Sequence, residues 1–138
     1  MTLDEYRIKH SMLIEQYQWI EFDLEGLFAF ICGEPFHEAI QEIEKDSIGG
    51  VVREIKKIEE ERNIVVFFDL EYEELDRIRQ RRNFWSHACY TESRGKQGVP
   101  KNADMLSEDL AIADHFLSRL RQIKDVFAEE YQENRFRP

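Results

Sequence analysis

The sequence is organised around the ten residues 81-RRNFWSHACY-90, which end a segment of helical spacing that starts at about residue 69. On an ideal helix with about 100° per residue, one apolar stripe holds Leu75, Ile78, Trp85 and Cys89. Arg82 falls inside the same stripe. Because an unpaired guanidinium is costly to bury, Arg82 needs an acidic partner, an opening to a cleft or an anionic ligand.

Polar side chains border this stripe. His87 lies roughly 140° around the helix from Arg82, and Asn83 and Tyr90 lie between them on the open side. Imidazole is the side chain whose ordinary pKa suits proton transfer near neutral pH, and a guanidinium offers fixed donors to phosphate oxygens. One interpretation is a site for phosphate chemistry. In the other, Arg82 and His87 bind acids and carbonyl groups within a helical bundle.

The string Arg82-Asn83-x-x-x-His87 resembles the signature of the HEPN superfamily of all-helical ribonucleases, an arginine and a histidine separated by four to six residues, with a polar residue after the arginine. The setting is similar too, because the motif comes late in a helix, before a polar loop and a final long helix. The resemblance implies a homodimer in which two motifs form one composite cleft that cuts RNA and leaves a 2′,3′-cyclic phosphate. It also implies that His87 is the general acid/base and Arg82 the phosphate clamp, while Asn83 orients His87 or binds phosphate.

Such strand cleavage needs a base for the 2′-hydroxyl, an acid for the leaving 5′-oxygen and positive charge beside the phosphorus, but in principle no metal. The sequence also lacks zinc-ligand spacing, a glycine-rich phosphate loop and a second Glu-x-x-His to match Glu34-x-x-His37. We therefore expect neither a metal nor a cofactor.

Charge is unevenly distributed along the chain, whose net charge is −10. Between Arg77 and Lys101 there are seven basic residues and one acid, Glu92, so this segment carries +6 and the rest −16. A basic segment around the motif favours contact with RNA phosphates. The residues expected to bind substrate are Arg79, Arg81, Tyr90, Arg94, Lys96 and Lys101. The alternative is that the arginines pair with acids elsewhere in the fold.

Helical spacing predicts most of the 138 residues to be helical. A helix of nearly thirty residues begins at Leu3, after the capping pair Thr2 and Glu5, and ends at Gly33. The next helices are expected over 36–44, 48–62 and 70–89, the last of them with Asp69 as N-cap. A loop over 91–104 precedes a final long helix that opens at Ser107-Glu108-Asp109. The run 64–68 has strand composition but no partner strand, so we interpret it as a connector.

The fold class predicted is all-α, a four-to-five-helix up-and-down bundle with long first and last helices, forming a single domain over 1–138. No apolar run approaches ~20 residues and no signal sequence is visible, so we expect a cytoplasmic protein that does not enter a membrane. Cys32 and Cys89 are expected to be free thiols.

The function predicted is a metal-independent endoribonuclease, a toxin or phage-defence effector that cuts single-stranded or tRNA-like RNA, with a possible antitoxin partner. A second interpretation is a non-catalytic module whose acidic surface and long first helix bind protein. A third is an inactive RNA-binding relative in which Arg82 still binds phosphate.

Overall fold

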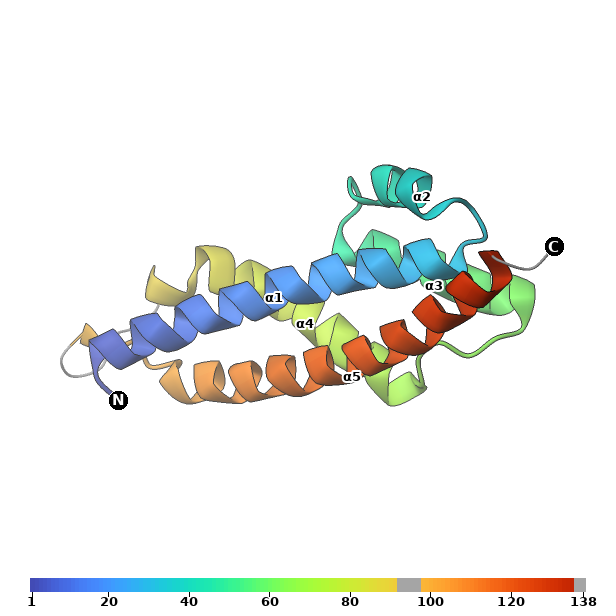
Figure 1. Cartoon of the computed structure of the whole chain (residues 1–138). Coiled ribbons are helices and arrows are strands. Elements are labelled where there is room, and N and C mark those ends of the chain that lie inside the picture. Colours follow the sequence, from blue (N-terminus) through green and yellow to red (C-terminus); the bar gives the residue numbers. More distant parts are fainter. Residues whose placement is uncertain (92–97, 136–138) are drawn as a thin grey trace.

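The computed structural model describes residues 1–91 and 98–135, and this part of the chain contains five α-helices (Figure 1). The helices are α1 (Leu3–Ile31), α2 (Phe36–Ile43), α3 (Ile48–Arg62), α4 (Asp69–His87) and α5 (Ala103–Arg135), and a 3₁₀ turn, η1, covers Cys89–Thr91. The predicted all-α bundle with long first and last helices is confirmed, since α1 has 29 residues and α5 has 33.

The two long helices, α1 and α5, run in the same direction. Three side-chain hydrogen bonds between them join residues 98 positions apart, namely Lys9 to Ser107 (3.0 Å), Gln16 to Asp114 (2.6 Å) and Asp23 to Arg121 (3.1 Å). Helix α4 runs the opposite way, because its start bonds to Arg119 of α5 and its end contacts Met105. The helices α3, α4 and α5 therefore alternate in direction (Figure 1). The short helix α2 lies to the side of the bundle, and after it α3 runs along α1.

A single core lies between these helices. The largest fully buried side chains are those of Trp85, Tyr6 and Phe116. The predicted stripe on α4 faces this core, as Leu75, Ile78, Trp85 and Cys89 are buried. Helix α4 thus turns one side to the core and leaves the other to solvent.

Local signals explain both ends of α1. The Thr2 side chain accepts the N–H of Glu5, and Glu5 accepts the N–H of Thr2, each at 3.1 Å. At the other end Gly33 has φ +84°, which a residue with a side chain adopts only with strain. Arg62 Nη1 donates to the Ile31 carbonyl at 2.6 Å and satisfies one of the free carbonyls at this end.

The predicted N-cap of α4 and the predicted start of α5 were wrong. Helix α4 begins at Asp69 with Phe68 in the N-cap position, and the N–H of Phe68 donates to Glu71 at 2.8 Å. Helix α5 begins at Ala103 rather than Ser107, with the first helical bond from Leu106 N to Asn102 O at 2.9 Å. The acids at the predicted start of α5 therefore lie inside the helix.

The apolar run 64–68 connects α3 to α4 without forming a strand. Val66 and Phe67 are buried, and their N–H groups donate to the Glu59 side chain at 2.8 and 3.2 Å. Glu59 also accepts the hydroxyl of Tyr72. One carboxylate thus satisfies the backbone donors that an irregular buried segment would otherwise leave without partners.

Over residues 1–91 and 98–135, none of the helices combines the length and the apolar composition that crossing a bilayer requires.

Candidate functional site

His87 is the last residue of α4 and is exposed to solvent. Asn83 and Arg79 precede it at intervals of four residues and are exposed as well. Residues four apart are neighbours on a helix surface, so these three side chains form a row along the outer side of α4. We call Arg79, Asn83 and His87 the α4 row. It is open to any ligand that reaches this side of the bundle.

Arg82 lies beside the α4 row, where α4 meets α1. Its Nη1 is 2.7 Å from Glu21 Oε1, and the Arg82 and Glu21 side chains are 44% and 24% exposed. Burial raises the pKa of the Glu21 carboxyl, and the charge of Arg82 opposes that rise. The sequence required a partner for this guanidinium, and the partner is an acid. Arg82 Nε and Nη2 have no hydrogen-bond partner within the described part of the chain.

Arg81 and Arg77 point to the other side of α4 and meet Asp109 of α5. Asp109 is only 2% exposed, with Arg77 Nη2 at 3.0 Å and Arg81 Nε at 3.7 Å from its carboxylate. Trp85 Nε1 donates to the same carboxylate at 2.8 Å. Arg81, a predicted substrate-binding residue, therefore braces α4 against α5.

Sequence reasoning treated Asp109 only as part of the start of a helix and missed this role. A signal was present, because Asp109 keeps helical spacing with Leu106 and Ala113 on the apolar side of α5. A carboxylate on the apolar face of a helix needs a cationic partner when it is buried, for the same reason that Arg82 on α4 needs an acidic one.

The other predicted contacts are scattered. Arg79 Nη2 is 2.7 Å from Asp76 Oδ1 in an exposed pair, and Lys101 is exposed after the loop. Arg94 and Lys96 lie outside the described residues. The α4 row and Arg82 are therefore the part of the predicted site that lies on one helix with access to solvent.

Tyr90 packs toward α1 and away from the α4 row. Its ring makes edge contacts with Tyr6 (5.4 Å between centroids) and His10 (5.2 Å). The Nε2 atom of His10 is 2.7 Å from the carbonyl oxygen of Trp85. His10 had no partner that the sequence revealed, and here it joins the end of α4 to α1.

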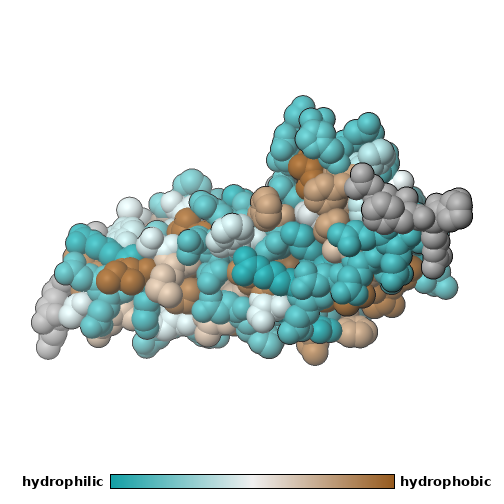
Figure 2. All heavy atoms as spheres, in the orientation of Figure 1, coloured by the Kyte–Doolittle hydropathy of each residue, from teal (hydrophilic) through white to brown (hydrophobic). Residues whose placement is uncertain are grey.

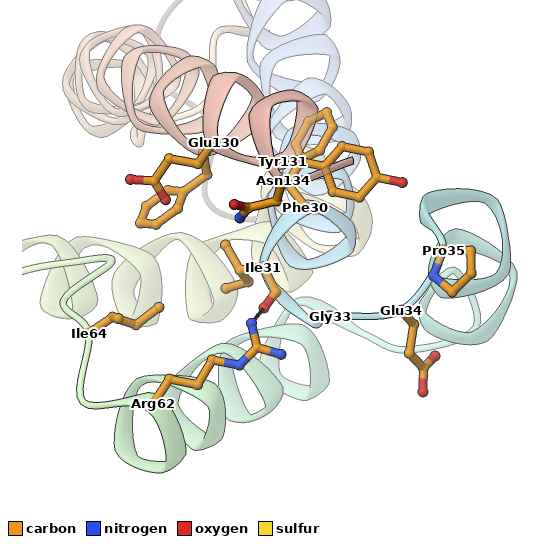
Figure 3. A pocket seen from close by; sticks show the side chains of 11 residues that line it. Phe30, Ile31, Gly33, Glu34, Pro35, Arg62, Ile64, Glu130, Tyr131 and Asn134 are labelled. Carbon is orange, nitrogen blue, oxygen red and sulfur yellow. Dashed lines mark hydrogen bonds between the residues drawn. The ribbon is translucent and has the colours of Figure 1, made fainter. Parts of the chain in front are cut away.

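A cavity of about 450 Å³ lies between the C-terminal ends of α1, α3 and α5 (Figure 3). Phe30 and Tyr131 provide aromatic walls, Glu34 and Glu130 provide carboxylates, and Arg62 lies across from them. The Arg62 guanidinium is bonded to the Ile31 carbonyl inside this cavity, which gives it a role in capping α1. The mixed charges select no single class of ligand.

Within the described ranges, no three His, Cys, Asp or Glu side chains gather closely enough to hold a metal ion. His37 is 3.2 Å from Gln41, one turn along α2. Cys32 and Cys89 form no disulfide within the described residues, and burial raises the pKa of the Cys32 thiol.

The site thus consists of an exposed histidine and amide in one row, with a half-exposed arginine beside them. The sequence matches no protein-family model, and no curated protein or solved structure is significantly similar to it. Its function is therefore argued from these residues.

Proposed function

We propose that the protein is a metal-independent endoribonuclease in which two copies bring their α4 rows to one phosphodiester. The observation that carries the proposal is the exposure of His87 and Asn83 beside the half-exposed Arg82. A histidine needed only for packing has no reason to face solvent next to an arginine with free donors. General acid/base chemistry requires this accessibility.

In the proposed reaction, the imidazole of one His87 removes the proton of the RNA 2′-hydroxyl. The 2′-oxygen attacks phosphorus, the bond to the 5′-oxygen breaks, and the imidazolium of the partner's His87 protonates the leaving oxygen. The products are a 2′,3′-cyclic phosphate and a 5′-hydroxyl. Arg82 Nε and Nη2 stabilise the charge on the phosphorane, and Asn83 binds a phosphate oxygen or orients His87 one turn away.

Two copies are required because each chain places one histidine, His87, in the α4 row. A second copy packed against the α4 row supplies the second proton-transfer group and excludes water from the phosphodiester. Single-stranded or tRNA-like RNA is the substrate we propose, because it can enter between two such helices. We further propose action as a toxin or phage-defence effector in the cytoplasm, held in check by an antitoxin.

His87→Ala tests the proposal directly. We expect cleavage of single-stranded RNA to fall by about 10²-fold or more, because the proton-transfer group is lost. His115→Ala is the matched control, since His115 is exposed on α5. Thermal melts of both variants should match the wild type, and equal cleavage by the wild type and His87→Ala would refute the proposal. The products are assayed for the cyclic phosphate.

The second candidate is a helical module that binds protein without catalysis. It is favoured by the ion pairs of all four α4 arginines, namely Arg77, Arg79, Arg81 and Arg82, each with an acid. Such pairs are expected of a structural role. A protein that neither binds nor cuts RNA at low salt would select this candidate.

A further inference from the structure

The side of α1 that faces away from the core carries a row of large apolar side chains. Ile8 is 62% exposed, Met12 45%, Trp19 44% and Phe22 58%. Together with Glu15, their positions alternate in steps of four and three residues, which is the spacing of a coiled-coil seam. We call these five residues the α1 stripe. In the orientation of Figure 1, apolar side chains interrupt the hydrophilic surface over the first half of α1 (Figure 2).

We propose that the α1 stripe is an interface with a second copy of this chain, in which the two α1 helices pack antiparallel. A helix whose apolar residues keep a four-three spacing is complementary in shape to an identical helix. A two-fold pair buries the same stripe on both copies, so each copy removes its own exposed apolar surface from water.

The charges on the α1 stripe also match a second copy. Glu15 is exposed in the middle of the stripe and forms no ion pair within the described residues. Beside Trp19 and Phe22, two cations share one buried carboxylate: Asp23 is 3.1 Å from Arg121 and 2.9 Å from Lys124. That cluster keeps one excess positive charge. The stripe thus offers a negative and a positive group to its partner.

These charges fix the orientation of the pair. A parallel pair places Glu15 against the partner's Glu15, and the two negative charges repel each other. In an antiparallel pair with its two-fold axis between Glu15 and Trp19, each Glu15 faces the partner's Trp19. The Arg121 guanidinium lies 5.5 Å from the centre of the Trp19 ring, so it comes within reach of that carboxylate.

Pairing through the α1 stripe goes beyond the proposed function. The stripe lies on the outer side of α1, and the α4 row lies on the outer side of a different helix. A pair formed by α1 alone leaves the two His87 side chains apart. A chain that uses both surfaces forms a closed tetramer when the two two-fold axes meet at right angles, and an open assembly otherwise.

The molar mass of the full chain in solution tests the interface, by light scattering and sedimentation equilibrium. Phe22→Glu places a charge in the seam and should halve the mass of the wild type, whether that is a dimer or a tetramer. Leu70→Glu is the control, because Leu70 is 73% exposed at the start of α4 and should leave the mass unchanged. A wild type that stays a single chain at millimolar concentration would overturn the proposal and assign the stripe to a different protein.

Glu15→Gln tests the orientation. The antiparallel pair loses two symmetric ion pairs, so its dissociation constant should rise by about five-fold. A parallel pair would lose a repulsion and associate more tightly. Unchanged or tighter association would overturn the antiparallel arrangement. These masses do not depend on RNA cleavage, so the result is separate from that of His87→Ala.

Discussion

The buried carboxylate of Asp109 determines which way the side chains of Arg77 and Arg81 point. A charge that is 2% exposed is stable only with compensating donors, and Trp85, Arg77 and Arg81 provide them from α4. Arg82, one residue beyond Arg81, points to a different helix and keeps nearly half of its surface in solvent. Neighbouring arginines in the sequence therefore have different roles, one bracing the core and one available to a ligand.

Replacement of Asp109 by Ala should lower the free energy of unfolding by about 3 kcal/mol, because it leaves the buried Trp85 N–H without its acceptor and removes the buried charge that pairs with Arg77 and Arg81. Urea denaturation followed by circular dichroism measures this. Asp125→Ala removes an exposed carboxylate from the same helix and should cost no more than about 0.5 kcal/mol. Equal costs for the two variants would show that the Asp109 cluster does not stabilise the fold.

Glu25 gives the fold a dependence on pH. Burial raises the pKa of its carboxyl, and the nearby Glu21 and Glu44 raise it further. The folded chain therefore holds this proton more tightly than the unfolded chain, so the contribution of Glu25 to stability declines as the pH rises through the ordinary glutamate range. Glu25→Gln should be more stable than the wild type near pH 7 and gain nothing near pH 4, about the ordinary pKa. A gain of the same size at both pH values would contradict this origin.

At the scale of elements, local signals predicted both ends of α1 and the buried stripe of α4. The start of α5 was not predictable in this way, because it depends on distant contacts. Asn102, which precedes α5, accepts the Tyr6 hydroxyl at 2.5 Å and donates to the carbonyl of Cys89 at 3.0 Å. Ser107 to Asp109 have the composition of a helix start, but the chain is already helical there.

In the candidate site too, features set by local spacing were predictable and contacts between helices were not. The sequence placed Asn83 and His87 on the open side of the helix and identified the need of Arg82 for a partner, since both follow from helical spacing. It did not identify Glu21 as that partner or Asp109 as the acceptor for Arg81, because those acids come from other helices. Local periodicity gives the face of a helix, whereas the residue that it meets depends on how the helices pack.

The junction between α1 and α2 makes a second prediction at this scale. Gly33→Ala should lower the free energy of unfolding by about 2 kcal/mol, because alanine is strained at φ +84° and its Cβ would collide with the Arg62 guanidinium that caps α1. Gly49→Ala is a control, because Gly49 lies in the first turn of α3 and a Cβ there would be 3.3 Å from the side chain of Arg79, which is flexible enough to move. Thermal denaturation compares them, and an equal effect would contradict the prediction.

At the scale of the whole molecule, the positive charge of α4 is matched largely by acids of other helices. Acids of α1 and α5 meet Arg82, Arg77 and Arg81, so the described arginines of α4 do not form an open basic patch. The same contacts hold α4 between the two parallel long helices. Among the described residues, the acidic remainder of the chain and this pairing together predict a narrow surface for RNA that consists of the α4 row, Arg82 and the exposed Lys101.

Salt dependence of RNA binding tests that limit. Each cation in contact with single-stranded RNA contributes about 0.7 to the slope of log affinity against log salt. Arg82→Gln should therefore reduce the slope by about 0.7 and weaken binding to RNA of any sequence. Arg77→Gln should leave the slope unchanged while lowering stability, because Arg77 is held by Asp109 and Glu108. Fluorescence anisotropy over a salt series measures both. An equal loss of slope in both variants would mean that RNA competes with Asp109 for its arginines, and that the bracing of α4 opens when RNA binds.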